Sequence, residues 1–112
     1  MSAHEFYLGK GYTSIAKTVV VSGTNTMAVW SPLGNKRVVV TNVNISTNPA
    51  GTIAFYFEAN DKIAEFITAG SATIVPTIGS WESTTNAGKI FVKLSASQTD
   101  GTRINLTGFE LD

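Results

Sequence analysis

A chain of 112 residues has the length of one domain, and its 8 basic and 8 acidic side chains leave it without net charge. Charged residues make up only 14% of the chain, so no basic patch is available to neutralise phosphates, and we expect no nucleic-acid partner. The absence of cysteine excludes disulfides and thiolate metal ligands, and no apolar run exceeds five residues, which excludes a membrane-spanning helix. We expect a protein made in the cytoplasm whose weakly charged surface favours oligomers or docking.

Residues 1–14 differ from the rest of the chain because they carry three aromatic side chains among two glycines and follow no steady period. We predict an N-terminal arm rather than a strand. Phe6, Tyr7 and Tyr12 would be poorly placed in water, and terminal segments are usually disordered unless something holds them. These rings could be buried either against a partner's surface or against the chain's own domain. The sequence favours neither possibility.

The first two strands are predicted at residues 15–22 and 26–30. The first alternates between apolar and polar side chains, which is typical of a half-buried strand. Lys17 shares the apolar face of this strand, so the strand should lie at an end or an edge of its sheet. Glycine, proline and asparagine in the segments that follow both strands predict turns.

Residues 36–45 are the predicted centre of the fold because their alternation is the most regular in the chain. The period of two places β-branched side chains together on one face, as expected for a strand beside a core; these are Val39, Thr41, Val43 and Ile45. A turn at 48–51 and a second alternating run at 53–57 follow at once. Two such runs joined by a short loop predict a β-hairpin.

Downstream of residue 60 the sequence predicts four more strands. The first, at 62–68, could pass for a helix, but its short length between turn signals favours a strand. Three further strands and their connections complete the chain: strands at 71–76, 89–96 and 102–111, a long polar connection at 77–88, and a turn at 99–101.

The last predicted strand contains a change of phase. Ile104 and Leu106 share one parity, whereas Phe109 and Leu111 have the opposite one. A β-bulge inserts one residue and reverses the faces of those that follow, and glycine is common at such positions. We therefore predict a bulge at Gly108.

About eight short strands separated by turns predict an all-β protein, with residues 15–112 as a single antiparallel β-sandwich of jelly-roll type. The composition agrees, since valine, isoleucine and threonine account for 34 of the 112 residues.

Residues able to carry chemistry are sparse. His4 is the only histidine, which argues against a metal site or a nucleophile–histidine pair. Glu58, Asp61 and Glu65 form the nearest carboxylate cluster, which could serve a glycosidase-type pair but is more simply a solvated turn. We expect no enzymatic activity, no metal and no cofactor.

Two N-glycosylation patterns begin at Asn44 and Asn105, both inside predicted strands, and we interpret them as chance matches. Trp30 and Trp81 are the large aromatic residues. Trp81 lies in the polar connection, where it could be a sugar-stacking platform, an anchor at one end of the sandwich or part of a subunit interface. The last two uses are the favoured interpretation.

From residue 18 onward, the order of turns and strands resembles small virion proteins of tailed bacteriophages, including head decoration (cement) proteins. The resemblance rests on an ordered set of short motifs, which are Ser22–Thr26, Gly34–Val38, Ser46–Thr47, Ala50–Thr52, Pro76 with Gly79–Trp81, Asn86–Lys89 and Val92–Ser95. It implies a jelly-roll sandwich, often trimeric, that binds the outside of a phage head.

The resemblance implies a structural virion protein on the capsid surface, with the major capsid protein and copies of itself as partners. Extensions such as residues 1–14 can clamp neighbouring subunits or the shell in these proteins, which gives Phe6, Tyr7 and Tyr12 as expected contacts. A tail- or fibre-associated carbohydrate-binding module is the alternative. Trp81, Tyr56 and the Asn/Thr-rich loops would carry that function.

Overall fold

The computed structural model describes residues 2–58, 60–96 and 101–112. This part of the chain contains one helix and nine strands, whose bounds are α1 (Ala3–Gly9), β1 (Ile15–Val21), β2 (Met27–Trp30), β3 (Arg37–Thr47), β4 (Gly51–Phe57), β5 (Asp61–Thr68), β6 (Ala72–Ile74), β7 (Trp81–Glu82), β8 (Ile90–Leu94) and β9 (Thr102–Leu111). The predicted all-β class is confirmed. The strand expected at 62–68 is present, whereas the short strand β7 lies where a polar connection was predicted.

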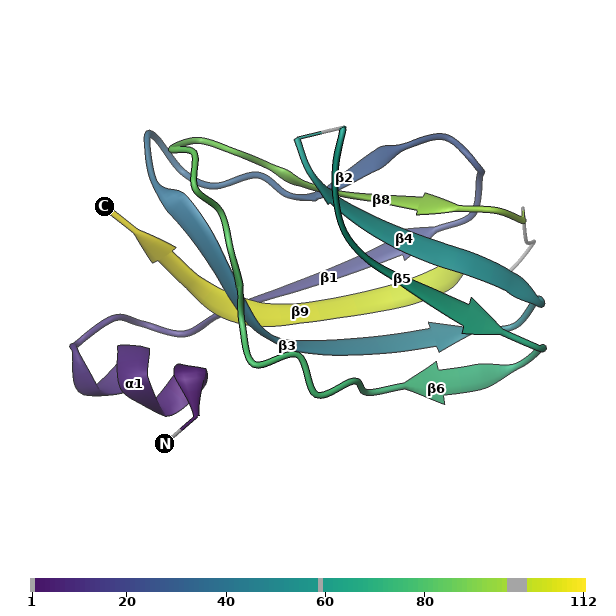
Figure 1. Ribbon diagram of the computed structural model, residues 1–112, viewed down its shortest axis with the longest axis horizontal. Coiled ribbons are helices and arrows are strands. Elements are labelled where there is room, and N and C mark those ends of the chain that lie inside the picture. The colour runs from purple at the N-terminus through teal and green to yellow at the C-terminus, as the bar shows by residue number, and fades with distance from the viewer. Residues whose placement is uncertain (1, 59, 97–100) are drawn as a thin grey trace.

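The strands form two antiparallel sheets packed face to face (Figure 1). Sheet A has the order β1-β9-β3-β6, with β7 also paired to β3, and sheet B has the order β2-β8-β4-β5. Over most of the chain, consecutive strands lie in opposite sheets. Together with the two strand orders, this connectivity is that of a jelly roll. β1 is an edge strand of sheet A, as Lys17 on its inward face predicted.

The predicted hairpin between the 36–45 and 53–57 runs is wrong, because β3 belongs to sheet A and β4 to sheet B. The turn at 48–51 carries the chain across the core from one sheet to the other. Alternation marks which face of each strand is buried, but two strands that face each other across a core alternate in the same way as two neighbours in a sheet. The hairpin that does form is β4–β5, with Gly51 opposite Thr68 and Phe57 opposite Asp61.

The core between the sheets is built from β-branched and aromatic side chains contributed by both layers. Its largest fully buried members are Trp30, Phe55, Ile45, Ile90, Ile104 and Leu106. Burying a side chain of this size contributes about 1.5–3 kcal/mol relative to leaving it in water. Since the chain has no disulfide, this core is the main source of stability for the sandwich.

β3 changes face in its middle, which the sequence did not predict. Val38 and Val40 lie in the main core, and so do Val43 and Ile45, whose parity is opposite. The pairing with β9 shifts between Val40 and Asn42, so one extra residue is inserted in β3 at this point. The expectation that Val39 faces the same way as Val43 is therefore wrong. Val39 instead joins a second buried cluster with Phe109 and Leu111.

The bulge predicted at Gly108 thus lies on the opposite strand. β9 pairs with β1 in an unbroken register from Thr102 to Gly108, so its own alternation is regular. Phe109 and Leu111 are buried on the outer face of sheet A because another part of the chain covers that face. In the sequence, these two outward apolar residues look like a reversal of the inward and outward alternation. Gly108 is required for a different reason: a Cβ there would overlap the carbonyl oxygen of Val39.

Of the turn predicted at 99–101, residues 99 and 100 lie outside the described residues, and Gly101 adopts a φ of 80°. This φ is in the left-handed region, where glycine is the least strained residue. The predicted turn after residue 47 is likewise completed by Gly51, whose φ is 149°.

Candidate functional site

The N-terminal segment folds back over its own sandwich and begins as a short helix. The hydroxyl of Ser2 accepts a 3.1 Å hydrogen bond from the backbone N–H of Glu5, which caps the first turn of α1. The segment was predicted as an arm rather than a strand, and the helix at Ala3–Gly9 is an element that this prediction did not include. The signal for the helix was present in the sequence, because Ser2 followed three residues later by Glu5 is a capping-box pattern.

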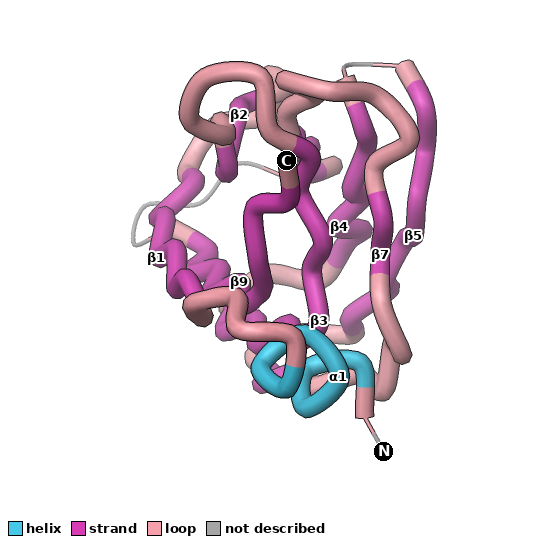
Figure 2. Tube along the Cα trace, turned by 90° about the vertical axis from the view of Figure 1, so that its left-hand side faces the viewer, coloured by secondary structure: helices cyan, strands magenta, loops and turns pink. Residues whose placement is uncertain are grey.

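α1 lies at one end of the sandwich beside β3 and β9 (Figure 2). Tyr7 and Tyr12 pack on the second buried cluster, formed by Val39, Phe109 and Leu111. The ring of Tyr7 lies 5.4 Å from that of Phe109 between centroids, in a tilted arrangement. Of the two covers that the sequence left open for these tyrosines, the chain's own domain is therefore the one present.

Polar contacts hold the same segment. The Tyr7 hydroxyl donates a 3.0 Å hydrogen bond to Oε1 of Glu82 on β7. Burial raises the pKa of Tyr7 above its usual value, and the hydrogen bond to the Glu82 carboxylate raises it further. The contact therefore favours the neutral phenol, which is the form able to donate.

His4 links α1 to the bulge of β3. Its Nδ1 lies 3.1 Å from Oγ1 of Thr41, the extra residue in that strand, and its ring is 5.1 Å from the ring of Phe109. The Thr41 hydroxyl is also 3.2 Å from the carbonyl oxygen of Thr107, to which it can donate a hydrogen bond. The only histidine of the sequence is therefore engaged in holding the helix against the sheet.

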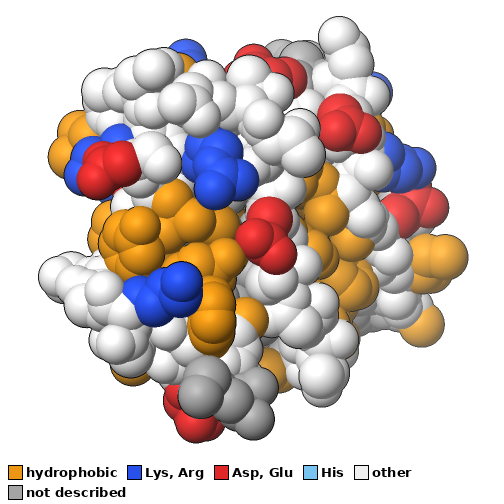
Figure 3. All heavy atoms as spheres, turned by 60° about the vertical axis from the view of Figure 1, so that its left-hand side comes forward, with side chains coloured by type: hydrophobic (Ala, Val, Ile, Leu, Met, Phe, Trp, Pro, Cys, Tyr) orange, Lys and Arg blue, Asp and Glu red, His pale blue; other side chains and the backbone are white. Residues whose placement is uncertain are grey.

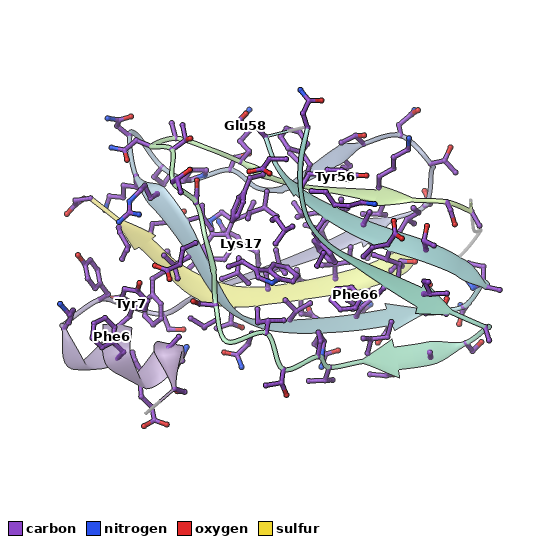
Figure 4. All side chains as sticks on the ribbon, in the orientation of Figure 1. Phe6, Tyr7, Lys17, Tyr56, Glu58 and Phe66 are labelled. Carbon is purple, nitrogen blue, oxygen red and sulfur yellow. The ribbon has the colours of Figure 1, made fainter. Side chains whose placement is uncertain are left out.

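Two large side chains of α1 are only partly covered by the sandwich. Phe6, labelled on the helix next to Tyr7 in Figure 4, is 45% exposed, and Leu8 is 46% exposed. The ammonium of Lys10 lies 4.9 Å from the centre of the Phe6 ring, which shields one face of that ring. Of the three predicted contact residues, Tyr7 and Tyr12 cover the domain and Phe6 faces outward.

Other aliphatic side chains are exposed around the sheet edges. Ile67 on the edge strand β5 is 78% exposed and Val75, just after β6, is 66% exposed. In the view that brings the α1 end of the molecule forward, hydrophobic side chains reach the surface in separate areas with charged side chains between them (Figure 3).

Trp30 and Trp81 are both buried, so neither presents a ring to solvent as a sugar platform or an interface would require. Trp81 packs between two aromatic rings, 5.2 Å from Phe55 and 6.4 Å from Phe66. Trp30 donates its indole N–H to the buried carboxylate of Glu110. Both residues therefore anchor the sandwich from within. Trp81 is buried because the polar connection around it forms β7, which pairs with β3.

The carboxylates near the β4–β5 turn have structural partners. Oε1 of Glu58 accepts a 3.1 Å hydrogen bond from the backbone N–H of Lys89, and the Glu58 backbone is paired to the same residue. Glu65 forms a 2.7 Å ion pair with Lys62 that raises the pKa of the lysine. In the part of the chain that the structure describes, no group of three or more His, Cys, Asp or Glu side chains is arranged to hold a metal ion.

Within residues 2–58, 60–96 and 101–112, no helix has the length and hydrophobicity needed to cross a bilayer.

Comparisons with known proteins give likenesses of fold. No family model matches the chain and no curated protein matches its sequence. The core of the Drosophila protein NLP, described with respect to pentamer formation and histone binding, matches with a TM-score of 0.54 at 12% identity. That match covers 89% of this chain and 100% of the other. At this identity the likeness concerns the β-sandwich alone.

Two viral capsid structures are among the other matches. The virus-like particle of the Macrobrachium rosenbergii extra small virus has a TM-score of 0.44 at 8% identity, over 89% of this chain and 78% of the other. The capsid of cyanophage Pam1 has a TM-score of 0.39 at 18% identity, over 90% and 82%.

Proposed function

We propose that this chain is a non-enzymatic structural protein of a phage virion. In this proposal it acts as a capsid decoration protein that binds the outside of the head as a homotrimer, and its partners are the major capsid protein and copies of itself. The observation that carries the proposal is the position of α1, which fixes Tyr7 to the sandwich and turns Phe6 and Leu8 outward.

The physical argument begins with the length of the helix. Isolated helices shorter than about 12–15 residues are marginal in water, so α1 depends on packing. Its inner side packs on the second buried cluster, whereas its outer side leaves two large apolar side chains in solvent. A second surface that covers Phe6 and Leu8 would remove that apolar area from water, which contributes roughly 25 cal/mol per Å².

The charge balance of the chain favours adhesion over recognition of a strongly basic partner. The chain has no net charge, and weakly charged surfaces associate readily. Histone binding, which is attributed to the Drosophila protein, would call for an acidic surface, and this chain has as many basic as acidic side chains. The assignment to a phage head in particular rests on the resemblance of residues 18–111 to virion proteins.

The test uses outward side chains only. The double variant Phe6→Gln/Leu8→Gln keeps good helix formers in α1 and leaves the second buried cluster covered. We expect it to fold normally and to lose occupancy on expanded heads of the phage that encodes it, measured by co-sedimentation. Ile67→Gln is the matched control, because it removes an exposed aliphatic side chain on β5, in the sheet that α1 does not cover.

Undiminished head occupancy in the Phe6/Leu8 variant would reject the role of α1. Light scattering behind a sizing column tests the trimer independently, and a monomer at working concentration would reject that part of the proposal. Deletion of residues 1–14 is less informative, since it would also uncover Phe109 and weaken the domain itself.

A further inference from the structure

The outer face of sheet A is unusual because its middle is lined by amides and hydroxyls. Outward side chains from four neighbouring strands meet there, namely Thr18, Asn105, Thr107, Asn42, Asn44, Ser46 and Thr73. Arg103 on β9 is the charged side chain of this middle area among the described residues, whereas the carboxylate of Glu82 on β7 lies at the α1 end of the face, where it accepts a hydrogen bond from Tyr7. The area extends from α1 to the opposite end of the sheet.

Asparagine is a costly choice at these positions. It is depleted from strands because it packs poorly on a pleated surface and competes for backbone hydrogen bonds. Here three asparagines occupy the two central strands, and Asn44 lies directly opposite Asn105. Threonine would keep the face polar with better strand propensity. Local choices that oppose the fold mark functional positions more often than accidents.

The two asparagines that begin the glycosylation patterns are neighbours in the folded sheet. Asn44 and Asn105 begin the two patterns in the sequence and are cross-strand partners in the structure. Both lie within regular strands, where their backbones are committed to the sheet. Their side chains therefore form one paired amide surface.

Much of the hydrogen-bonding capacity of this surface is unused. Thr18 Oγ1 donates a 2.7 Å hydrogen bond to Oδ1 of Asn105. This contact leaves the amide NH₂ of Asn105 as a donor, and no hydrogen bond in the described part of the chain engages the side chain of Asn44. Each primary amide offers two donors and an acceptor with two lone pairs.

Two shallow hollows lie along the face. One is bordered by His4, Asn44, Asn105 and Val75, and the other by Val20, Ser46, Thr73 and Arg103. Each therefore combines polar side chains with one exposed aliphatic side chain. Neighbouring strands lie about 4.8 Å apart, so the rows present hydrogen-bonding groups at a regular spacing.

We propose that the outer face of sheet A binds a carbohydrate chain that carries carboxylates, as a uronic-acid polysaccharide does. Sugar hydroxyls donate and accept hydrogen bonds, which matches the amides and hydroxyls of this face. Val20 and Val75 cover the C–H faces of the sugar rings. Arg103 pairs with a sugar carboxylate through two parallel N–H···O bonds. This site borders α1 at His4 but uses neither Phe6 nor Leu8, and it does not depend on the capsid role.

The experiment is calorimetric titration of the full chain with defined oligomers of galacturonate, of mannuronate–guluronate and of glucuronate, with neutral dextran oligomers beside them. We expect one acidic oligomer to bind in preference to dextran. The double variant Asn44→Thr/Asn105→Thr should weaken that binding about thirtyfold, because it removes two hydrogen bonds worth about 1 kcal/mol each. Its thermal unfolding should occur at or above the wild-type temperature, because threonine favours strands.

Arg103→Gln should remove the preference for the acidic oligomer, whereas Lys93→Gln is a matched loss of one exposed positive charge on β8 of the other sheet. The proposal is overturned if no acidic oligomer binds at millimolar concentration. It is also overturned if the asparagine variant binds as the wild type does, or if Lys93→Gln weakens binding as much as Arg103→Gln.

Discussion

The indole Nε1 of Trp30 donates a 2.9 Å hydrogen bond to Oε2 of Glu110, and both side chains are buried. The other carboxylate oxygen, Oε1, accepts a 3.2 Å hydrogen bond from the backbone N–H of Leu33. A single carboxylate thus joins the end of β9 in sheet A to β2 and its following loop in sheet B. Both of its oxygens are used, which explains how an acidic residue is tolerated at this depth.

Glu110→Ala should therefore be strongly destabilising. It leaves the buried indole N–H of Trp30 and the part-buried backbone N–H of Leu33 without their partner, and an unsatisfied buried donor costs about 1–3 kcal/mol. We expect the free energy of unfolding in urea to fall by about 3 kcal/mol. Glu65→Ala, which removes an exposed ion pair, should cost less than about 1 kcal/mol and serves as the control. Equal losses in the two variants would contradict the structural role of Glu110.

Gly108→Ala tests the close approach of β9 to the bulged strand. A Cβ at this position would overlap the carbonyl oxygen of Val39, and both are backbone positions that cannot rotate away. We expect a loss of about 3 kcal/mol in the free energy of unfolding. Gly70→Ala has open space around the new Cβ and should stay within about 0.5 kcal/mol of the wild type.

Tyr7 should make the stability depend on pH in the alkaline range. Its pKa in the folded state is raised above the ordinary value of 10.0, by burial first and by Glu82 second. The unfolded chain therefore loses the proton before the folded one, and the stabilisation present below about pH 10 declines as pH rises further. Urea midpoints should fall more steeply between pH 9 and pH 11 for the wild type than for Tyr7→Phe, both pH values being roughly one unit from that ordinary pKa. Parallel profiles would contradict this assignment.

Trp81→Ala should open a cavity between Phe55 and Phe66. Replacing a buried aromatic by alanine typically costs about 3–5 kcal/mol, because the packing contacts are lost and the cavity collapses only in part. Trp81→Phe keeps an aromatic ring there and should cost less than half as much. A loss below about 1 kcal/mol for Trp81→Ala would show that the side chain is not an anchor of the core.

The sequence predicted the strands well because an alternating pattern reports directly which face of a strand is buried. The prediction from alternation failed where side chains are buried by a covering segment and not by the core between the sheets. Phe109 and Leu111 are apolar because Tyr7 and Tyr12 cover them, and a distant covering segment cannot be recognised from the pattern of β9 alone. The resulting change of parity was attributed to a bulge in the wrong strand.

The choice of partner strand was not predictable for a related reason. β3 and β4 are joined by a short turn with glycine and proline, which is typical of a hairpin, but both strands direct bulky side chains such as Ile45 and Phe55 into one shared core. In the candidate site, the sequence left two covers open for Phe6, Tyr7 and Tyr12, and the choice for the two tyrosines depends on the distant cluster around Phe109. The amide pair of Asn44 and Asn105 depends on cross-strand register, which no single segment encodes.

The strand order also controls when this protein can fold. β9 is synthesised after the other strands of the described sheet A, yet it lies between β1 and β3 and pairs with both. A chain emerging from the ribosome therefore cannot complete sheet A until residues 102–111 have left the exit tunnel. Pairings between such distant segments form slowly, in milliseconds to seconds for sandwiches of this size. A product that stops before residue 102 would present two unpaired edges lined with valine and isoleucine, and it should aggregate rather than fold into a smaller domain.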